Sequence, residues 1–145
     1  MTYRLPSGGH VDRSKPLGFS FDGKRYSGFA GDTLASALIA NGVHLVGRSF
    51  KYHRPRGFLS AGSDEPNALV GVGGSEARYT PNLRATQVEL YDGLVAESQN
   101  RWPSLSLDLG AVNDLFSRFL TAGFYYKTFM WPAAAWKTLY EPMIR

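Results

Sequence analysis

The sequence predicts an α+β domain over residues 17–100, with a polar N-terminal arm at 1–16 and an aromatic-rich helical extension at 101–145. Three observations support this division. Two Asp-Gly pairs flanked by apolar residues indicate β-hairpins. One short apolar run between a capping residue and a glycine indicates a helix. Residues 102–140 hold ten of the twenty aromatic residues, so the chain changes character after the domain.

The first strand pair is expected on either side of Asp22-Gly23. Leu17–Phe21 alternates apolar residues with small or polar ones, which is typical of a strand with one buried face. Asp-Gly favours the two-residue turn that joins antiparallel strands, and Lys24–Phe29 returns as the second strand.

A short helix is expected next, over Leu34–Ala40. Asp32 or Thr33 can cap its free N–H groups, and Gly42 can take the left-handed position that ends it. A strand is then expected over Val43–Val46.

The second half of the domain is predicted to be mainly strands. Glu65–Val72 is expected to be a strand and 75–83 a loop. Arg84–Leu90 alternates well and is predicted to be a further strand. Asp92-Gly93 is the second hairpin signal, with Leu94–Ser98 as the returning strand.

The extension is expected to contain two helices. Ala111–Leu120 has apolar residues at helical spacing, and Pro132–Tyr140 has a proline near its first turn. Aromatic tails seldom stay in water, because burial of each ring is worth roughly a few kcal/mol. The extension therefore either folds back on the β domain or packs on a partner or on further chain, and we favour the second.

Positive charge is concentrated in one stretch, Gly47–Gly57, which we call the basic segment. The chain has 16 Lys and Arg against 12 Asp and Glu, a formal charge of +4. The basic segment holds four cations and no acid, so the rest of the chain balances at 12 against 12. This distribution disfavours a protein that coats nucleic acid and favours a single site for an anion or an acidic partner.

Five side chains of the basic segment are candidate contacts for a phosphate or a protein surface: Arg48, Lys51, His53, Arg54 and Arg56. Guanidinium forks and a lysine charge suit phosphate and carboxylate groups. The alternative stays open that the segment is a solvated loop, or that its charges pair with acids elsewhere in an assembly.

The rest of the sequence predicts no catalytic or metal site. The chain has no cysteine, which excludes disulfides, thiolate zinc sites, cysteine nucleophiles and cysteine-ligated iron–sulfur clusters. Its three histidines form no close pair. Asp64, Glu65 and Glu97 are candidate carboxylates, but nothing in the sequence brings two of them together for acid–base chemistry. Gly71–Ser75 is expected to be a turn rather than a phosphate loop.

The chain is expected to be cytoplasmic and to bind neither a membrane nor nucleic acid. No apolar run reaches the roughly 20 residues of a membrane span. Its first residues contain no apolar stretch of the signal-peptide kind.

The hairpin, the helix and the glycine-bounded loop together resemble the start of a β-grasp domain of the plant-type [2Fe–2S] ferredoxin kind. The resemblance implies that the basic segment stands where such domains carry clustered cysteines, and that no cluster is held here. Five stretches carry a second resemblance: Gly47–Gly57, Ser60–Val70, Pro81–Thr86, Gln99–Pro103 and Phe124–Trp131. With these stretches nearly the whole chain resembles the start of the α subunits of heterotetrameric sarcosine oxidases.

The resemblance implies that the chain is an N-terminal piece of a longer subunit, which continues into dinucleotide-binding and folate-binding domains. The parent complex would oxidatively demethylate sarcosine to glycine with O₂, giving H₂O₂ and a one-carbon unit for tetrahydrofolate. Its implied cofactors are FAD, FMN, NAD and tetrahydrofolate. Its implied partners are the remaining α domains and the β, γ and δ subunits. None of its catalytic residues would lie in this chain.

We therefore expect a structural and assembly domain whose basic segment docks on a neighbouring domain, a subunit or a flavin phosphate. The alternatives are a stand-alone electron-transfer protein, or an anion- or nucleic-acid-binding module. Visible absorbance of the purified chain distinguishes the electron-transfer alternative, and binding of random oligonucleotides at low salt distinguishes the nucleic-acid alternative.

Overall fold

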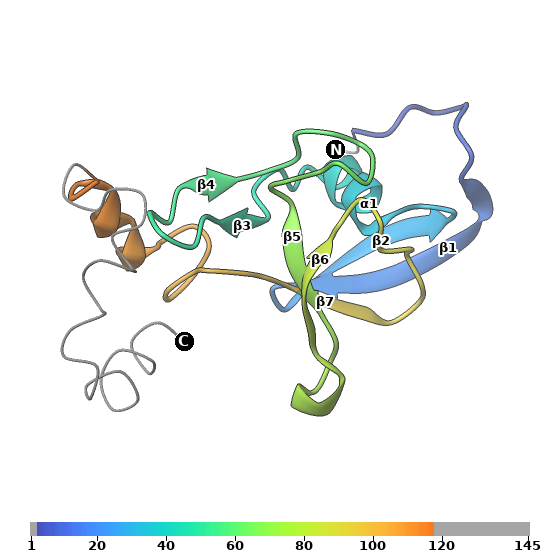
Figure 1. Cartoon of the computed structure of the whole chain (residues 1–145). Coiled ribbons are helices and arrows are strands. Elements are labelled where there is room, and N and C mark those ends of the chain that lie inside the picture. Colours follow the sequence, from blue (N-terminus) through green and yellow to red (C-terminus); the bar gives the residue numbers. More distant parts are fainter. Residues whose placement is uncertain (1–2, 118–145) are drawn as a thin grey trace.

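The computed structural model describes residues 3–117, which form a mixed five-stranded sheet with one α-helix packed on it (Figure 1). The strands are β1 (Asp12–Phe21), β2 (Lys24–Ala30), β3 (Gly47–Arg48), β4 (Pro55–Arg56), β5 (Leu69–Val72), β6 (Thr80–Arg84) and β7 (Leu94–Ser98). The helices are α1 (Leu34–Ala40) and the 3-10 helices η1 (Glu76–Arg78) and η2 (Leu109–Asp114). The sheet order is β2-β1-β7-β5-β6, with β1 and β7 parallel, and β3 and β4 form a separate pair.

The predicted hairpin at Asp22-Gly23 is confirmed. Both turn residues have positive φ angles, 49° and 77°, as a two-residue turn that follows the twist of the strands requires. β1 begins earlier than predicted, at Asp12, and so includes the last residues of the predicted arm. The side chains of residues 12–16 are all exposed, which leaves no burial pattern in the sequence to reveal this end of the strand.

The predicted helix is confirmed with its bounds. Thr33 is the N-cap and forms a capping box with Ser36, each side chain bonding the other residue's backbone N–H at 3.2 and 3.0 Å. At the other end Gly42 has a φ of 78°, and the N–H of Val43 bonds the carbonyl of Leu38 at 2.9 Å. This is the glycine-ended Schellman arrangement, which is why the helix ends there.

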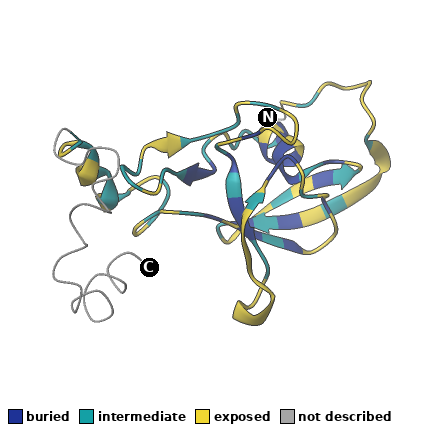
Figure 2. Ribbon diagram, viewed as in Figure 1, coloured by how far each residue is buried: buried dark blue, intermediate teal, exposed yellow. Residues whose placement is uncertain are grey.

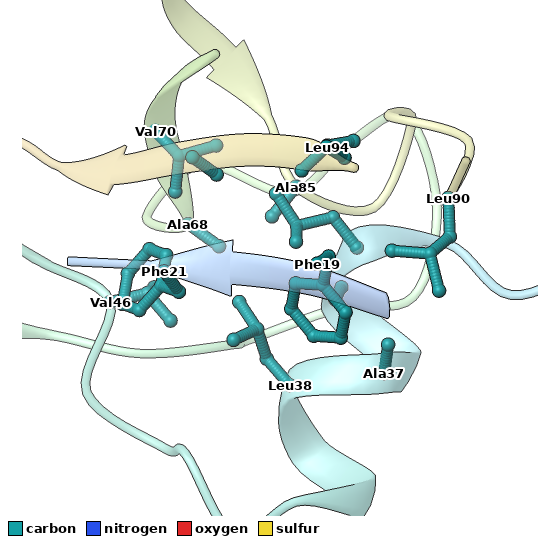
Figure 3. Close-up of a cluster of buried hydrophobic side chains, with 13 residues drawn as sticks. Phe19, Phe21, Ala37, Leu38, Val46, Ala68, Val70, Ala85, Leu90 and Leu94 are labelled. Atoms are coloured by element: carbon teal, nitrogen blue, oxygen red, sulfur yellow. The ribbon is translucent and has the colours of Figure 1, made fainter. Parts of the chain in front are cut away.

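The core lies between α1 and the sheet (Figure 3). Phe19 and Phe21 of β1 are both buried on the same face of the strand, where they meet Leu34 and Leu38 of α1 and Leu94 of β7. Figure 2 shows the buried residues gathered along α1 and the centre of the sheet, with exposed residues towards the strand ends. The sheet thus buries one face against the helix.

The strand predicted over Val43–Val46 is wrong. Within this stretch the N–H of Val46 bonds the carbonyl of Arg56 at 2.9 Å, and a ladder with β4 begins only at β3. Val46 is fully buried. Its apolar character therefore reflects core packing of an irregular connection, not strand pairing.

The strand predicted over Glu65–Val72 is wrong in its first half, because only β5 is a strand. The N–H groups of Asn67 and Ala68 bond the Glu65 carboxylate at 2.7 and 3.1 Å, so they are not free for a ladder. The predicted loop at 75–83 is also wrong in part. It contains η1 and most of β6, an edge strand whose side chains are mostly exposed.

The strand predicted over Arg84–Leu90 is wrong, because β6 ends at Arg84 and the residues after it are not in a strand. Ala85 and Leu90 are buried, but the N–H groups of Gln87 and Val88 bond the carbonyl of Arg84, which makes a turn. The turn at Asp92-Gly93 and the strand β7 after it are as predicted, but they form no hairpin. β7 pairs with β1 and β5 instead.

The extension is described only as far as residue 117. Within that part, η2 is a 3-10 helix where an α-helix was expected from Ala111. Trp102 and Phe116 have exposed fractions of 64% and 53%. The remainder of Ala111–Leu120 and the whole helix expected over Pro132–Tyr140 lie outside the described residues. No helix of the described part is long and apolar enough to cross a membrane.

Candidate functional site in the basic segment

The basic segment folds into a small hairpin of its own. β3 and β4 pair Gly47 with Arg56 and Arg48 with Pro55. The turn between them is closed by the N–H of His53, which bonds the carbonyl of Ser49 at 2.9 Å. Figure 1 shows this hairpin projecting from the main sheet towards the chain that follows β7. The segment is thus ordered by backbone bonds and positioned between two parts of the chain.

Arg48 and His53 contact the stretch 102–114, which we call the following segment. The guanidinium of Arg48 donates to the carbonyl of Leu105 at 2.8 and 3.2 Å, and to the carbonyl of His53 at 3.0 Å. His53 Nδ1 lies 2.8 Å from Asp108 Oδ2, and Arg48 Nε lies 3.7 Å from the same oxygen. Two of the five candidate residues therefore converge on one carboxylate.

Asp108 is the centre of this contact, and its side chain is fully buried. Its other oxygen accepts the N–H groups of Trp102 and Gly110 at 3.0 and 3.1 Å. Burial alone would raise the pKa of Asp108, but the hydrogen bonds from His53 and from these two N–H groups outweigh it and hold the pKa below its usual range. The carboxylate therefore stays charged at neutral pH.

Arg54 makes a second, more exposed ion pair. Its Nε and Nη2 atoms lie 2.8 and 2.7 Å from Asp114 Oδ1, with exposed side-chain fractions of 53% and 44% for the two partners. The guanidinium also lies over the ring of Tyr52, 4.8 Å from its centroid, and Lys51 Nζ lies 4.9 Å from the same centroid. Exposed pairs of this kind contribute little stability singly.

Arg56 points elsewhere, and among residues 3–117 it forms no ion pair with a carboxylate. Its Nη1 donates to Asn67 Oδ1 at 2.7 Å. Both groups line a hollow of about 520 Å³ beside β3 and β5. The lining residues combine two cations with several amides: Arg48, Ser49, Phe50, Arg56, Pro66, Asn67, Leu69, Asn82, Gln99 and Asn100. Such a lining offers hydrogen bonds to an anion or to a polar backbone.

The structure therefore divides the five candidates. Arg48, His53 and Arg54 face the following segment, Arg56 faces the hollow, and Lys51 lies over an aromatic ring. Two acids receive these cations, Asp108 and Asp114, and neither was predicted as part of the site. They are the first acids after Glu97 in the sequence, which is the signal that could have identified them.

The described residues contain no group of three or more His, Asp or Glu side chains that could hold a metal ion. Asp64 accepts the hydroxyl of Ser60 at 2.9 Å and lies at the surface. Glu65, by contrast, is fully buried. Neither residue forms a carboxylate pair suited to acid–base chemistry.

Residues 14–101 match the family described as the 2Fe-2S iron-sulfur cluster binding domain. Sarcosine oxidase subunit alpha of Rhizobium meliloti (strain 1021) is 67% identical over 144 residues, which cover 99% of this chain and 14% of that protein. The subunit of the same name from Corynebacterium sp. (strain U-96) is 43% identical over 95 residues, covering 62% and 10%. The crystal structure of L-proline dehydrogenase from P. horikoshii matches with a TM-score of 0.51 at 26% identity, covering 63% of this chain and 17% of that one.

A [2Fe–2S] cluster does not fit the residues present. Plant-type clusters are held by four cysteine thiolates, and even the mixed type keeps two cysteines beside two histidines. This chain has no cysteine, so no protein thiolate is available to either kind of site.

Proposed function

We propose that this chain is a structural and assembly domain of a sarcosine oxidase subunit alpha. The chain belongs to the 2Fe-2S iron-sulfur cluster binding domain family, and it is homologous to the N-terminal region of that subunit. In this role the basic segment anchors the following segment, residues 102–114, on the domain. The chain spans 14% of the Rhizobium relative, so the activity of the whole protein is part of the proposal.

The observation that carries the proposal is the buried contact at Asp108. The His53 ring lies within hydrogen-bond distance of its carboxylate, Arg48 adds a charge at 3.7 Å, and two N–H groups of the following segment bond its other oxygen. A buried carboxylate with several charge-assisted hydrogen bonds is costly to disrupt, because loss of one partner leaves the other without compensation. We therefore infer that this buried contact anchors the following segment on the domain.

The fold also supports a scaffold role. A helix crosses a mixed sheet whose neighbouring strands β1 and β7 run parallel, and this arrangement supports the β-grasp fold that we propose for the domain. With no cysteine to hold a cluster, the domain would contribute geometry rather than electrons to its complex.

The proposed parent complex oxidatively demethylates sarcosine with O₂ and passes a one-carbon unit to tetrahydrofolate. Its FAD, FMN and NAD would be bound by the other α domains and by the β, γ and δ subunits. This chain would supply no catalytic residue. Its place would be beside the next α domain, reached through the following segment.

The test uses the full-length subunit, co-expressed with its partners and carrying Asp108→Asn together with Asp114→Asn. Lys24→Gln, an exposed cation at the β1–β2 turn, is the matched control. We expect less assembled complex from the double variant and unchanged sarcosine turnover per assembled flavin. Assembly equal to that of the control would refute the proposal.

The hollow at Arg56 favours a second candidate function, the binding of an anionic group such as a flavin phosphate. Within residues 3–117 the guanidinium of Arg56 makes one hydrogen bond, to Asn67, so it has donors left, and the amides around it supply more. If this holds, Arg56→Gln in the same complex releases FMN while assembly stays intact. If FMN content is unchanged, the hollow does not bind the flavin phosphate.

A further inference from the structure

The most unusual group in the structure is the carboxylate of Glu65, which is fully buried. Its Oε2 accepts the N–H groups of Leu59 and Ser60 at 2.7 and 2.6 Å. Its Oε1 accepts those of Asn67 and Ala68 at 2.7 and 3.1 Å. Within the described part of the chain it has no cationic partner, so backbone dipoles alone balance its charge.

The electrostatics agree with a charged group. Burial acts to raise the pKa of Glu65, but the four N–H donors outweigh burial and leave the pKa below its usual value. A carboxylate that accepts several backbone N–H bonds is an anion in a backbone nest. The loop 57–68 is therefore shaped around a negative charge that the chain itself supplies.

The position of this nest in the sequence can be compared with the positions of cluster ligands in [2Fe–2S] domains. Plant-type clusters use the spacing C-x4-C-x2-C with a distant fourth cysteine, and hydrogen bonds to the cluster sulfurs help set its properties. Ser60, Glu65 and Ala68 have this same spacing. Thr86, a buried residue that follows later in the chain, lies against the same loop, because its hydroxyl donates to the carbonyl of Gly62 at 2.8 Å.

We propose that the Glu65 carboxylate replaces the [2Fe–2S] cluster as the anion around which this loop folds, and that Ser60, Glu65, Ala68 and Thr86 stand at the four former ligand positions. The loop's N–H groups, which would otherwise need a cluster or water, are satisfied from within the chain. The domain can then keep its scaffold without metal. The former cluster site lies at residues 60–86, not in the basic segment as the sequence analysis expected.

The first test restores the ligands. The full chain carrying Ser60→Cys, Glu65→Cys, Ala68→Cys and Thr86→Cys is refolded without oxygen in the presence of ferrous iron and sulfide. We expect about one [2Fe–2S] cluster per chain, seen by visible absorption and by an electron paramagnetic resonance signal after reduction. The control carries four cysteines in the basic segment, at Arg48, Lys51, Arg54 and Arg56, and is treated identically.

Cluster uptake by the first variant and not by the control supports the proposal. Absence of a cluster in the first variant, or equal uptake by the control, overturns the placement of the ligand positions. Refolding with the metal present lets the measurement stand even if the metal-free variant does not fold, because cluster binding and folding are then one event.

The second test asks whether the negative charge organises the loop. Glu65→Gln keeps the shape but turns an amide towards N–H donors, while Asp64→Asn removes the neighbouring exposed charge. We expect Glu65→Gln to lower Tm by at least about 10 °C and Asp64→Asn by less than about 3 °C. Equal Tm values for the two variants would overturn the role given to Glu65.

Discussion

Replacing Asp108 by Asn is the most informative single substitution for testing the buried contact between the basic segment and the following segment. The asparagine keeps one oxygen and places an NH₂ group where the other oxygen was. In one orientation the NH₂ group faces His53 Nδ1, which lies 2.8 Å from the carboxylate, and the guanidinium of Arg48. In the other orientation it faces the N–H groups of Trp102 and Gly110. The second orientation sets donors against donors, and the first does so at the guanidinium and wherever Nδ1 of His53 carries the proton.

The expected cost follows from these contacts. Removing one partner of a buried ion pair costs about 3–5 kcal/mol, and each hydrogen bond to a charged group contributes about 1.5–3 kcal/mol. Because one side of the contact can still be satisfied, we take about 3 kcal/mol for opening of the following segment. That figure corresponds to a factor on the order of 100 in the opening equilibrium.

Hydrogen exchange of the Leu109 amide reports whether the following segment keeps its fold around this contact. Leu109 N–H bonds the carbonyl of Trp102 at 2.7 Å, within the following segment. We expect exchange on the order of 100-fold faster in Asp108→Asn, with the amide of Leu94 in β7 unchanged. Asp114→Asn, which removes the exposed pair, is expected to change Leu109 exchange by less than about fivefold. Equal protection of Leu109 in the wild type and in Asp108→Asn would refute the reasoning.

Three further outcomes are expected. The pKa of Glu65 is lower in the folded chain than in the unfolded chain. The charged carboxylate therefore contributes fully to stability above the unfolded pKa, roughly 4.3, and this contribution is lost as pH falls through the folded pKa. Urea unfolding should therefore show a smaller loss of stability between pH 6 and pH 3 in Glu65→Gln than in the wild type. Gly28→Ala would make its Cβ clash with Leu90 Cδ2, so we expect a loss of about 1–3 kcal/mol in the same assay. We expect little loss from Gly18→Ala, whose nearest neighbour is at 3.6 Å. Thr33→Ala removes the helix cap and is expected to cost about 1 kcal/mol by the same measurement.

Local signals in the sequence were sufficient where backbone chemistry is decided within a few residues. The turn at Asp22-Gly23 and the ends of α1 at Thr33 and Gly42 follow from glycine and capping preferences, and all three are confirmed. Likewise Leu94–Ser98, predicted as the strand that follows the Asp92-Gly93 turn, is β7. These features need no knowledge of distant partners.

The predictions failed where burial and hydrogen bonding had separate causes. Val46 and Leu90 are apolar because they fill the core from irregular connections, so the stretches that contain them, Val43–Val46 and Arg84–Leu90, were predicted to be strands. β6 showed no alternation because it lies at the sheet edge with most side chains exposed. Glu65 was noticed as a carboxylate, but a nest built from backbone N–H groups leaves no mark in side-chain identity.

The candidate site was predicted in part. The charge count identified the basic segment, and its side chains do meet acids. It could not identify those acids, because Asp108 and Asp114 are separated from their partners by 55 and 60 residues along the chain. The β3–β4 hairpin determines which cations contact the following segment and which line the hollow. The sequence did not predict this hairpin, because a strand was expected at Val43–Val46 instead.

The central claim is that the basic segment and the following segment form one docked unit through Asp108. A double-mutant cycle of His53→Asn and Asp108→Asn, read from Leu109 exchange, tests it most directly, because it isolates the energy shared by the two side chains. We expect a coupling of about 1.5–3 kcal/mol, with the double variant little worse than Asp108→Asn alone. Additive effects, and hence a coupling near zero, would contradict the claim.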